Sequence, residues 1–331
     1  MLKKVFILLV TILPCACSSE QKPVYPYDDL LRLNHIQTKG THNSYHIAQP
    51  DGGIPKYDYT HVPLDEQLTR QGVRQFELDV YYYPSGEFVV YHNEGDDLST
   101  CALLTDCLQT VKDWSDAHPD HHALCMHIEI KEDKAGVDPE VLNQALDDKI
   151  LSVWPRERIV TPDDVQKGYP TMRDALNTQG WPTLGETRGK ILFVLLDLAE
   201  WRDSYTRGLT STEGRVLFAE SLGDLDIAAF ARLDAPIEME GPLREAVGQK
   251  SLIVRTRADE AGNQARDTDY TRLEKALEAG AQLISTDFPA KVDEYEYWVE
   301  IPDGTPSRCN PLTAPNYCTP LAIENPTIVY W

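Results

Sequence analysis

Apolar and polar positions divide the chain into two alternating kinds of segment. Short apolar runs predict strands at residues 35–42, 73–83, 87–94, 123–131, 190–197, 226–233, 251–258 and 281–288. Helix-like segments separate many of these runs, at residues 63–72, 105–119, 138–151 and 269–280. Gly72, Gly189 and Gly280 each fall between a helix and the next strand, which is typical of a helix C-terminal cap.

Eight strands that alternate with helices, without a linker or a break in composition, predict a single α/β domain folded as a (β/α)₈ TIM barrel. The sixth unit, around residues 226–233, is poorly marked, so we expect the barrel to be irregular. Beyond Asp293 the chain becomes aromatic and then proline-rich with two cysteines. We therefore expect the barrel to occupy residues 34–298 and a disulfide-closed tail to occupy residues 299–331.

The N-terminus resembles a bacterial export signal. Two lysines precede an apolar run from Val5 to Leu13 that is too short to span a bilayer comfortably. Cys17 follows Ala16 as in a lipoprotein signal, which predicts a signal peptide at 1–16, a lipidated Cys17 and a linker at 17–33. The expected location is the bacterial cell envelope, outside the cytoplasm. Simple cleavage is the alternative, since Pro14 and Cys15 are unusual in such a signal.

The chain is strongly acidic, with 31 basic and 53 acidic residues and a formal net charge of −22. This balance argues against nucleic acid as a partner and against a polybasic grip on anionic lipid. Any membrane attachment is therefore expected to come from the lipid on Cys17, and the protein itself is expected to be a monomer.

The cysteine spacing indicates disulfides rather than a metal site. Outside the cytoplasm disulfides can form, and pairing Cys101 with Cys107 and Cys309 with Cys318 would close two short loops. Cys125 lies in an apolar strand and is expected to be a buried thiol. The chain has neither a C-x-x-C motif nor a Cys/His zinc spacing, which argues against zinc.

Polar residues interrupt the first four predicted strands near their C-terminal ends, where barrel enzymes build their active sites. In chain order they are His42, Asn43, Glu77, Asp79, His92, Glu129 and Lys131. Residues two apart on a strand share a face, so each of the pairs Glu-x-Asp and Glu-x-Lys points in one direction. All seven are therefore expected to converge on the same rim.

The oxygen-bearing members of this set suit a hard cation. Asn43, Glu77, Asp79 and Glu129 offer only oxygen ligands, and four protein oxygens favour Ca²⁺ over Mg²⁺, which usually keeps several waters. The histidines remain available for proton transfer near neutral pH. A divalent cation, two histidines and a lysine together indicate phosphodiester cleavage, with Lys131 and the cation stabilising charge on the phosphoryl oxygens.

Several motifs resemble one known family. "THNSY", "ELDVY", "VYHNE" and "HIEIK" are similar to the first histidine, metal pair, second histidine and final metal glutamate of the calcium-dependent bacterial phosphoinositide-specific phospholipases C. "GWPTLGETRGKILFVLLD", "LIVRTRAD" and "LISTDFP" also look like segments of this family, so the resemblance runs from about residue 34 to 298.

The resemblance implies a fold and a reaction. The family belongs to a superfamily of glycerophosphodiesterase-like TIM barrels, and the inositol 2-hydroxyl usually attacks phosphorus to release diacylglycerol and a cyclic inositol phosphate. Carried over, His42 and His92 form the acid/base pair, with His92 as the acid toward the glycerol oxygen. Asn43, Glu77, Asp79 and Glu129 become the Ca²⁺ ligands. The group that takes the attacking proton stays open.

Two other functions remain open from the sequence. A glycerophosphodiester phosphodiesterase shares the metal-and-histidine logic, but that family usually begins with His-Arg where this chain has His42-Asn43. A surface lipoprotein that only binds inositol phosphates or glycans would need neither histidine for catalysis. On the seventh strand, Arg257 is a candidate for contacting phosphate or inositol, and Asp259 and Asp287 are candidate supporting residues.

Five other histidines are not expected to take part in catalysis. We expect loop or surface positions, without a role in the chemistry, for His46, His61, His118, His121 and His122. The head group, and whether the substrate is a lipid, a glycosylated anchor or a soluble phosphodiester, lie outside what these patterns can decide.

Overall fold

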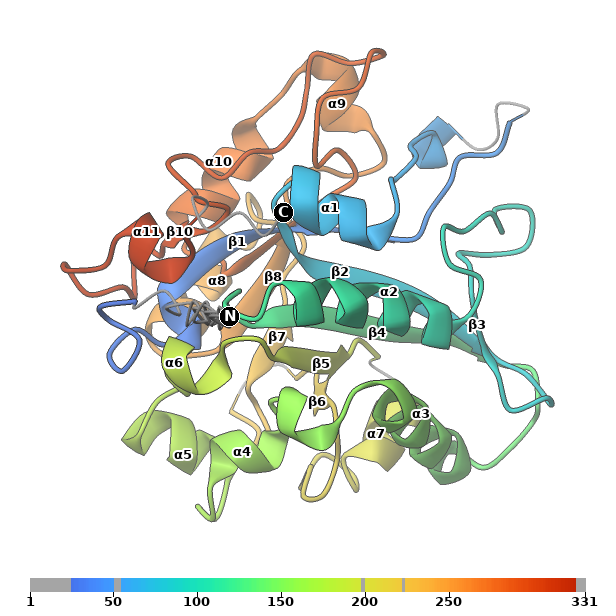
Figure 1. Cartoon of the computed structure of the whole chain (residues 1–331), viewed down its shortest axis with the longest axis horizontal. Coiled ribbons are helices and arrows are strands. Elements are labelled where there is room, and N and C mark those ends of the chain that lie inside the picture. The colour runs from blue at the N-terminus through green and yellow to red at the C-terminus, as the bar shows by residue number, and fades with distance from the viewer. Residues whose placement is uncertain (1–24, 51–54, 198–199, 222–223, 326–331) are drawn as a thin grey trace, which may run out of the picture.

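Eight parallel strands form a nearly closed barrel in the computed structural model, which describes residues 25–50, 55–197, 200–221 and 224–325 (Figure 1). In spatial order β6-β5-β4-β2-β1-β9-β8-β7, a parallel bridge from Glu220 to Phe230 joins the two ends. The strands are β1 (Ile36–Thr41), β2 (Val73–Tyr82), β4 (Leu124–Asp133), β5 (Ile191–Leu195), β6 (Phe218–Ala219), β7 (Phe230–Arg232), β8 (Ile253–Arg257) and β9 (Leu283–Thr286). The predicted irregular TIM barrel is confirmed, and its irregularity lies in the very short β6 and β7.

One predicted barrel strand was wrong. Residues 87–94 contain β3 (Phe88–Val90), which pairs antiparallel with β2 and forms a hairpin beside the barrel. Only five residues separate Tyr82 from Phe88, whereas a crossover to a parallel strand needs a dozen or more. The missing eighth strand is β6, whose two residues give no readable apolar run. The expected strand count was therefore right, but one member was misassigned.

Helices cover the outside of the barrel (Figure 1). The four predicted helices are present as α1 (Leu64–Arg70), α2 (Leu104–Ala117), α3 (Pro139–Val153) and α10 (Thr271–Glu278). The other helices are α4 (Pro162–Gln166), α5 (Met172–Thr178), α6 (Leu184–Thr187), α7 (Glu200–Tyr205), α8 (Glu240–Gly248), α9 (Asn263–Asp267) and α11 (Pro320–Ile323). Short 3₁₀ turns occupy η1 (Leu33–His35), η2 (Pro55–Tyr57) and η3 (Arg156–Arg158). Gly72 and Gly280 have φ angles of 67° and 81°, which confirms that they end α1 and α10 in the left-handed conformation.

Strand β2 illustrates how the sequence divides the interior. Phe76, Leu78 and Val80 are buried in the apolar layer between the sheet and the helices α1, α2 and α3. Their neighbours Glu77 and Asp79 alternate with them and face the barrel interior, where they are also almost fully buried. The apolar face stabilises the fold, and the opposite face carries the charges.

The C-terminal segment closes the N-terminal end of the barrel. β10 (Arg308–Cys309) pairs antiparallel with β1, and Glu324 binds the guanidinium of Arg74 at the start of β2. The disulfides Cys101–Cys107 and Cys309–Cys318 are both present. Among the described residues Cys125 is the one free thiol, and it is buried as expected.

Four of the loop histidines are buried, contrary to a surface position. His46, His61, His121 and His122 are each at most 2 % exposed. Hydrogen bonds explain how loops can hold them: Nε2 of His121 lies 2.7 Å from Ser115 Oγ, and Nε2 of His122 lies 2.7 Å from Ser307 Oγ. Burial lowers the pKa of His61 and of His122 to about 4, so both are neutral at pH 7.

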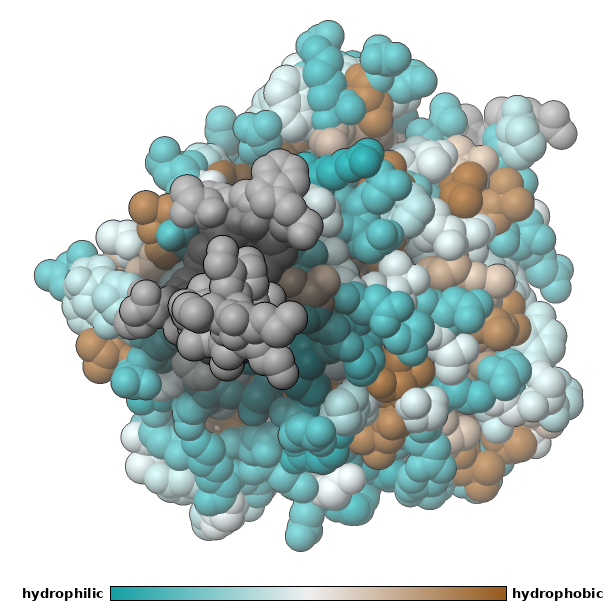
Figure 2. Space-filling model, in the orientation of Figure 1, coloured by the Kyte–Doolittle hydropathy of each residue, from teal (hydrophilic) through white to brown (hydrophobic). Residues whose placement is uncertain are grey.

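The face of the molecule in Figure 2 is mainly hydrophilic outside the grey residues, and apolar side chains occur there in small scattered groups. Within the described part of the chain, no helix is long and apolar enough to cross a membrane. The predicted signal peptide and Cys17 lie outside the described residues.

Candidate active site

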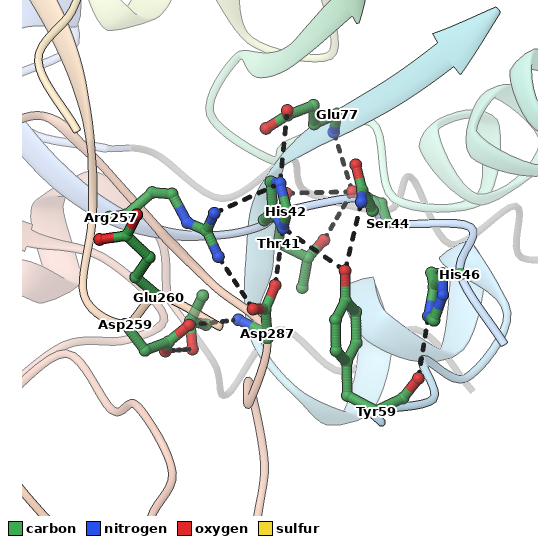
Figure 3. A network of polar contacts seen from close by, with 12 residues as sticks. Thr41, His42, Ser44, His46, Tyr59, Glu77, Arg257, Asp259, Glu260 and Asp287 are labelled. Carbon is green, nitrogen blue, oxygen red and sulfur yellow. Dashed lines mark hydrogen bonds and ion pairs between the residues drawn. The ribbon is translucent and has the colours of Figure 1, made fainter. Parts of the chain in front are cut away.

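The turn after β1 carries the first two candidate residues. Asn43 has a φ of 43°, a left-handed conformation that asparagine tolerates better than most residues. Ser44 fixes the turn to β2, because its amide donates to the carbonyl of Glu77 at 2.9 Å and its hydroxyl accepts from the amide of Glu77 at 2.8 Å. Thr41 Oγ1 adds a bond of 2.7 Å to Ser44 Oγ (Figure 3). His42 and Asn43 are therefore held directly beside Glu77.

Three carboxylates form a cluster at this end of the barrel. Asp79 and Glu129 are register partners on β2 and β4, and ligand oxygens of Glu77, Asp79 and Glu129 lie within 4.8 Å of one another. Neither buried oxygen of Asp79 has a hydrogen-bond partner among the described residues. Burial, reinforced by Glu129 and Glu77, raises the pKa of Asp79 well above that of an ordinary carboxyl. A buried, unsatisfied carboxylate beside two others is what a cation site requires.

Two positively charged side chains, Lys131 and Arg255, contact this cluster. Lys131 Nζ lies 3.0 Å from Glu129 Oε1 and 3.4 Å from Asp79 Oδ2. Arg255 is fully buried and binds both Glu77 and, at 2.8 Å, Asp234. Lys131, a predicted phosphate contact, is thus placed against the carboxylates, and Arg255 compensates the charge of Glu77 from within the barrel.

His42 is oriented by a carboxylate. Its Nδ1 lies 2.7 Å from Asp287 Oδ1, and Arg257 donates to the other oxygen of Asp287 at 2.8 Å (Figure 3). Burial alone would raise the pKa of Asp287, but Arg257 and His42 outweigh it and hold this pKa well below the ordinary value. An ionised Asp287 accepts the Nδ1 proton, so the His42 Nε2 lone pair points the other way, toward Glu77 Oε1 at 4.0 Å.

Asp259 in turn fixes Asp287. One oxygen of Asp259 accepts from the backbone amide of Asp287 at 2.9 Å, and the other accepts from the Thr286 hydroxyl. Burial and the nearby charge of Asp287 raise the pKa of Asp259 to about 6. The two candidate supporting residues, which follow β8 and β9, therefore act in sequence, with Asp259 holding Asp287 and Asp287 holding His42.

His92 reaches the site from the loop that follows β3 rather than from a barrel strand. Its Nδ1 lies 2.8 Å from Asp96 Oδ2, its backbone carbonyl accepts from Tyr81 OH at 3.0 Å, and the ring of Tyr57 stands edge-on at 4.4 Å. Burial lowers the pKa of His92, opposed by Asp96 and reinforced by Lys131 and His42. The ring of His92 lies 6.4 Å from that of His46, whose amide donates to the Asn43 carbonyl, so His92 lies next to the turn that carries His42 and Asn43.

The sequence interpretation missed Asp96 and Tyr59. Asp96 stands four residues after His92 in the turn "HNEGD", a spacing that allows the chain to fold back on the histidine. Tyr59 OH lies 3.3 Å from the amide nitrogen of Asn43 and 3.4 Å from His42 Nδ1, yet it comes from an irregular loop. No periodic pattern could have placed that loop over the barrel mouth.

The sequence matches a family model described as Ca²⁺-dependent phosphoinositide phospholipase C over residues 31–92 and 86–311. The chain belongs to this family. It is therefore an enzyme of the phosphoinositide-specific phospholipase C class, a family that depends on Ca²⁺. The resemblance drawn from the four motifs is confirmed.

Solved structures of this class share the fold. A calcium-dependent phosphoinositol-specific phospholipase C from Pseudomonas sp. is 19 % identical, with a TM-score of 0.60 over 86 % of this chain and 97 % of that one. Its myoinositol complex is 20 % identical, with a TM-score of 0.59 over the same shares. A Ca²⁺-dependent phosphatidylinositol-specific enzyme from Streptomyces antibioticus is 18 % identical, with a TM-score of 0.58 over 78 % of this chain and 95 % of that one. Among curated proteins no sequence matches.

Proposed function

We propose that this phospholipase C cleaves the phosphodiester of phosphatidylinositol and releases diacylglycerol and a cyclic inositol phosphate. The observation that carries the proposal is the pairing of two histidines, each bonded to its own carboxylate, with a cluster of three further carboxylates, two of which are buried. A glycerophosphodiester phosphodiesterase is the competing outcome of the test below.

The proposed ligands of a Ca²⁺ ion are Asn43, Glu77, Asp79 and Glu129. The oxygens of Asp79 support this assignment, because they accept no hydrogen bond among the described residues and Lys131 is their ion-pair partner at 3.4 Å. A cluster of buried carboxylates is costly unless cations compensate its charge. When bound, the ion would draw negative charge from the phosphoryl oxygens. The match of the donor set to a hard cation is the physical reason to place it here.

Proton transfer falls to the two histidines. His42 Nε2, opposite the Nδ1 that Asp287 holds, removes the proton of the inositol 2-hydroxyl as its oxygen bonds to phosphorus. The bond between phosphorus and the glycerol oxygen breaks, and His92 donates a proton to that oxygen. Asp96 holds the opposite ring nitrogen of His92, which leaves Nε2 for the leaving group. One proton is taken up and one is released in each turnover.

Arg257 is the proposed contact for a phosphoryl or inositol oxygen. Its Nη1 lies 3.5 Å from His42 Nε2, so its guanidinium stands beside the nitrogen that acts as the base. Lys131 supplies a second positive charge at the carboxylate cluster. Both side chains are partly exposed, 13 % for Arg257 and 25 % for Lys131, which leaves them accessible to a substrate.

The product distinguishes the two enzyme functions. Intramolecular attack by the cis 2-hydroxyl can lower the barrier by about 7–11 kcal/mol, so we expect a five-membered cyclic diester first. Phosphorus NMR of early time points with phosphatidylinositol and Ca²⁺ should show its downfield signal, and glycerophosphocholine should not react. Acyclic inositol monophosphate as the sole first product, or release of glycerol 3-phosphate, would replace this proposal by the glycerophosphodiesterase.

We further propose that a lipid on Cys17 anchors the enzyme in the bacterial cell envelope. The apolar run from Val5 to Leu13 followed by Cys17 supports this location. The full chain expressed in a bacterium should incorporate labelled fatty acid and fractionate with membranes. Cys17→Ser should lose both the label and the membrane association. An unlabelled wild-type protein in the soluble fraction would favour simple cleavage.

A further inference from the structure

His46 is completely buried beside the active site and joins two of its loops. Its Nε2 lies 2.8 Å from Asp96 Oδ1, and its Nδ1 lies 2.9 Å from the carbonyl oxygen of Tyr59, a bond visible in Figure 3. The other oxygen of Asp96 is the one that holds His92 Nδ1, also at 2.8 Å. His46, Asp96 and His92 therefore form one continuous chain of hydrogen bonds.

The hydrogens that the two ring bonds of His46 require indicate how strong these hydrogen bonds are. A carbonyl oxygen only accepts, so Nδ1 of His46 must carry a hydrogen toward Tyr59. The short contact between Nε2 and Asp96 Oδ1 also needs a hydrogen between two atoms that otherwise both accept. With the hydrogen on Nε2 the bond joins an imidazolium to a carboxylate, and such charge-assisted bonds are about twice as strong as neutral ones.

Without His46, little else in the turn would hold the Asp96 side chain. Asp96 and Asn93 bond through their backbones at 3.0 and 3.3 Å, which shapes the turn but leaves the carboxylate held by its bond to His92 alone. The Asp96 side chain is 4 % exposed, so an unpaired oxygen there would be left without water. His46 satisfies that oxygen and fixes the plane of the carboxylate.

We propose that His46 is a positioning residue, which fixes the carboxylate of Asp96 and through it the ring of His92. This role rests on the proposed function, because it concerns the acid that protonates the leaving group. In the described part of the chain the His46 ring bonds Asp96 and the Tyr59 carbonyl, and no hydrogen bond joins it to the side chain of a proposed metal ligand. The His46 ring packs against the ring of Tyr59, with 4.5 Å between centroids. Tyr59 also contacts Asn43 and His42, so the same tyrosine supports both His46 and His42.

The test compares three variants of the full chain. His46→Leu removes both ring hydrogen bonds, whereas His46→Gln keeps a donor near the position of Nε2. His121→Leu is the matched control, because His121 is equally buried and also makes two ring hydrogen bonds, to Ser115 and to the His122 carbonyl. Thermal unfolding of each variant measures the common cost of losing a buried histidine.

Two substrates separate positioning from folding. On phosphatidylinositol, His46→Leu should lower kcat by about 10–10²-fold, the usual effect of a misplaced catalytic group or of a lost supporting residue. An inositol phosphate ester of nitrophenol has an acidic leaving group that needs no proton, and its turnover should change little. His46→Gln should recover most of the loss, and His121→Leu should retain wild-type kcat on both substrates.

The pH profile gives a readout that a structural role would not move. Asp96, Lys131 and His42 are the charged groups that act on His92. In His46→Leu, Asp96 no longer accepts a hydrogen bond from residue 46, so its carboxylate would stabilise protonated His92 more strongly and raise the pKa of His92. The alkaline limb of kcat/KM should therefore move to higher pH in this variant alone. An unmoved limb together with equal losses on both substrates would overturn the role of His46. A wild-type enzyme inactive on phosphatidylinositol would instead overturn the proposed function.

Discussion

Replacing His92 by alanine is expected to lower turnover on phosphatidylinositol by about 10²–10⁴-fold, the usual contribution of a positioned acid or base. The same replacement at His42 should cost as much, because His42 is oriented by Asp287 as His92 is by Asp96. Steady-state kinetics on lipid in mixed micelles measures both losses. Ca²⁺ affinity by calorimetry should change little, since neither histidine is a proposed ligand.

A substrate with an acidic leaving group separates the two roles. Its departing oxygen needs no proton, so His92→Ala should be largely spared on a nitrophenyl ester while His42→Ala remains impaired. His118→Ala is a suitable control, because His118 stacks on Trp114 on the helical layer and bonds the Trp114 carbonyl. Near-normal turnover of His92→Ala on the natural lipid would remove His92 as the acid.

Replacing Asp79 by asparagine is expected to abolish Ca²⁺-dependent activity and to weaken Ca²⁺ binding by more than about 100-fold, the most that losing a supporting group around a metal usually costs. Excess chelator should likewise inactivate the wild-type enzyme, and Ca²⁺ should restore it. Glu132→Gln on the neighbouring strand β4 is the matched control, because Glu132 is 53 % exposed and pairs only with Lys134 among the described residues. Full activity in excess chelator would contradict the metal site.

Replacing Asp79 should raise the thermal stability of the metal-free protein, although it abolishes activity. Burial and the neighbouring carboxylates raise its folded pKa above the unfolded value. Such a group favours folding below the unfolded pKa, and this contribution is lost as pH rises through the folded pKa. Without metal at neutral pH, Asp79→Asn should therefore unfold at a higher temperature than the wild type. Ca²⁺ at 100 times its dissociation constant should stabilise the wild type by about 2.7 kcal/mol and the variant hardly at all. A metal-free variant less stable than the wild type would show that the ion pair with Lys131 outweighs the cost of burying Asp79.

Strong periodic segments made most of the fold predictable. The alternation in β2, with Phe76 and Leu78 packed outward and Glu77 and Asp79 inward, follows from the two-residue period of a strand. The weak segments were the ones misread. β6 has two residues and too little apolar sequence to stand out, and β3 has the composition of a barrel strand but too short a connection to be one.

The site residues on strands were predictable from the sequence, whereas those in irregular loops were not. Asp79 and Glu129 were predictable neighbours because both lie near the carboxyl ends of strands, and those strands proved to be adjacent. Asp96, His46 and Tyr59 lie in irregular loops, where no period relates sequence position to direction. Their roles depend on contacts across 50 residues in one case, from His46 to Asp96, which local sequence does not encode.

The sequence by itself determined the family, the barrel and the residue types of the chemistry, because strand period and ordered motifs are local properties of the chain. Only the tertiary structure decided how those residues are held: Asp287 behind His42, Asp96 behind His92, and Lys131 against the carboxylates rather than apart from them. The physical reason is that burial and hydrogen bonding set the charge and orientation of a side chain. Both depend on which distant segments pack around it, as the complete burial of the loop residue His46 shows.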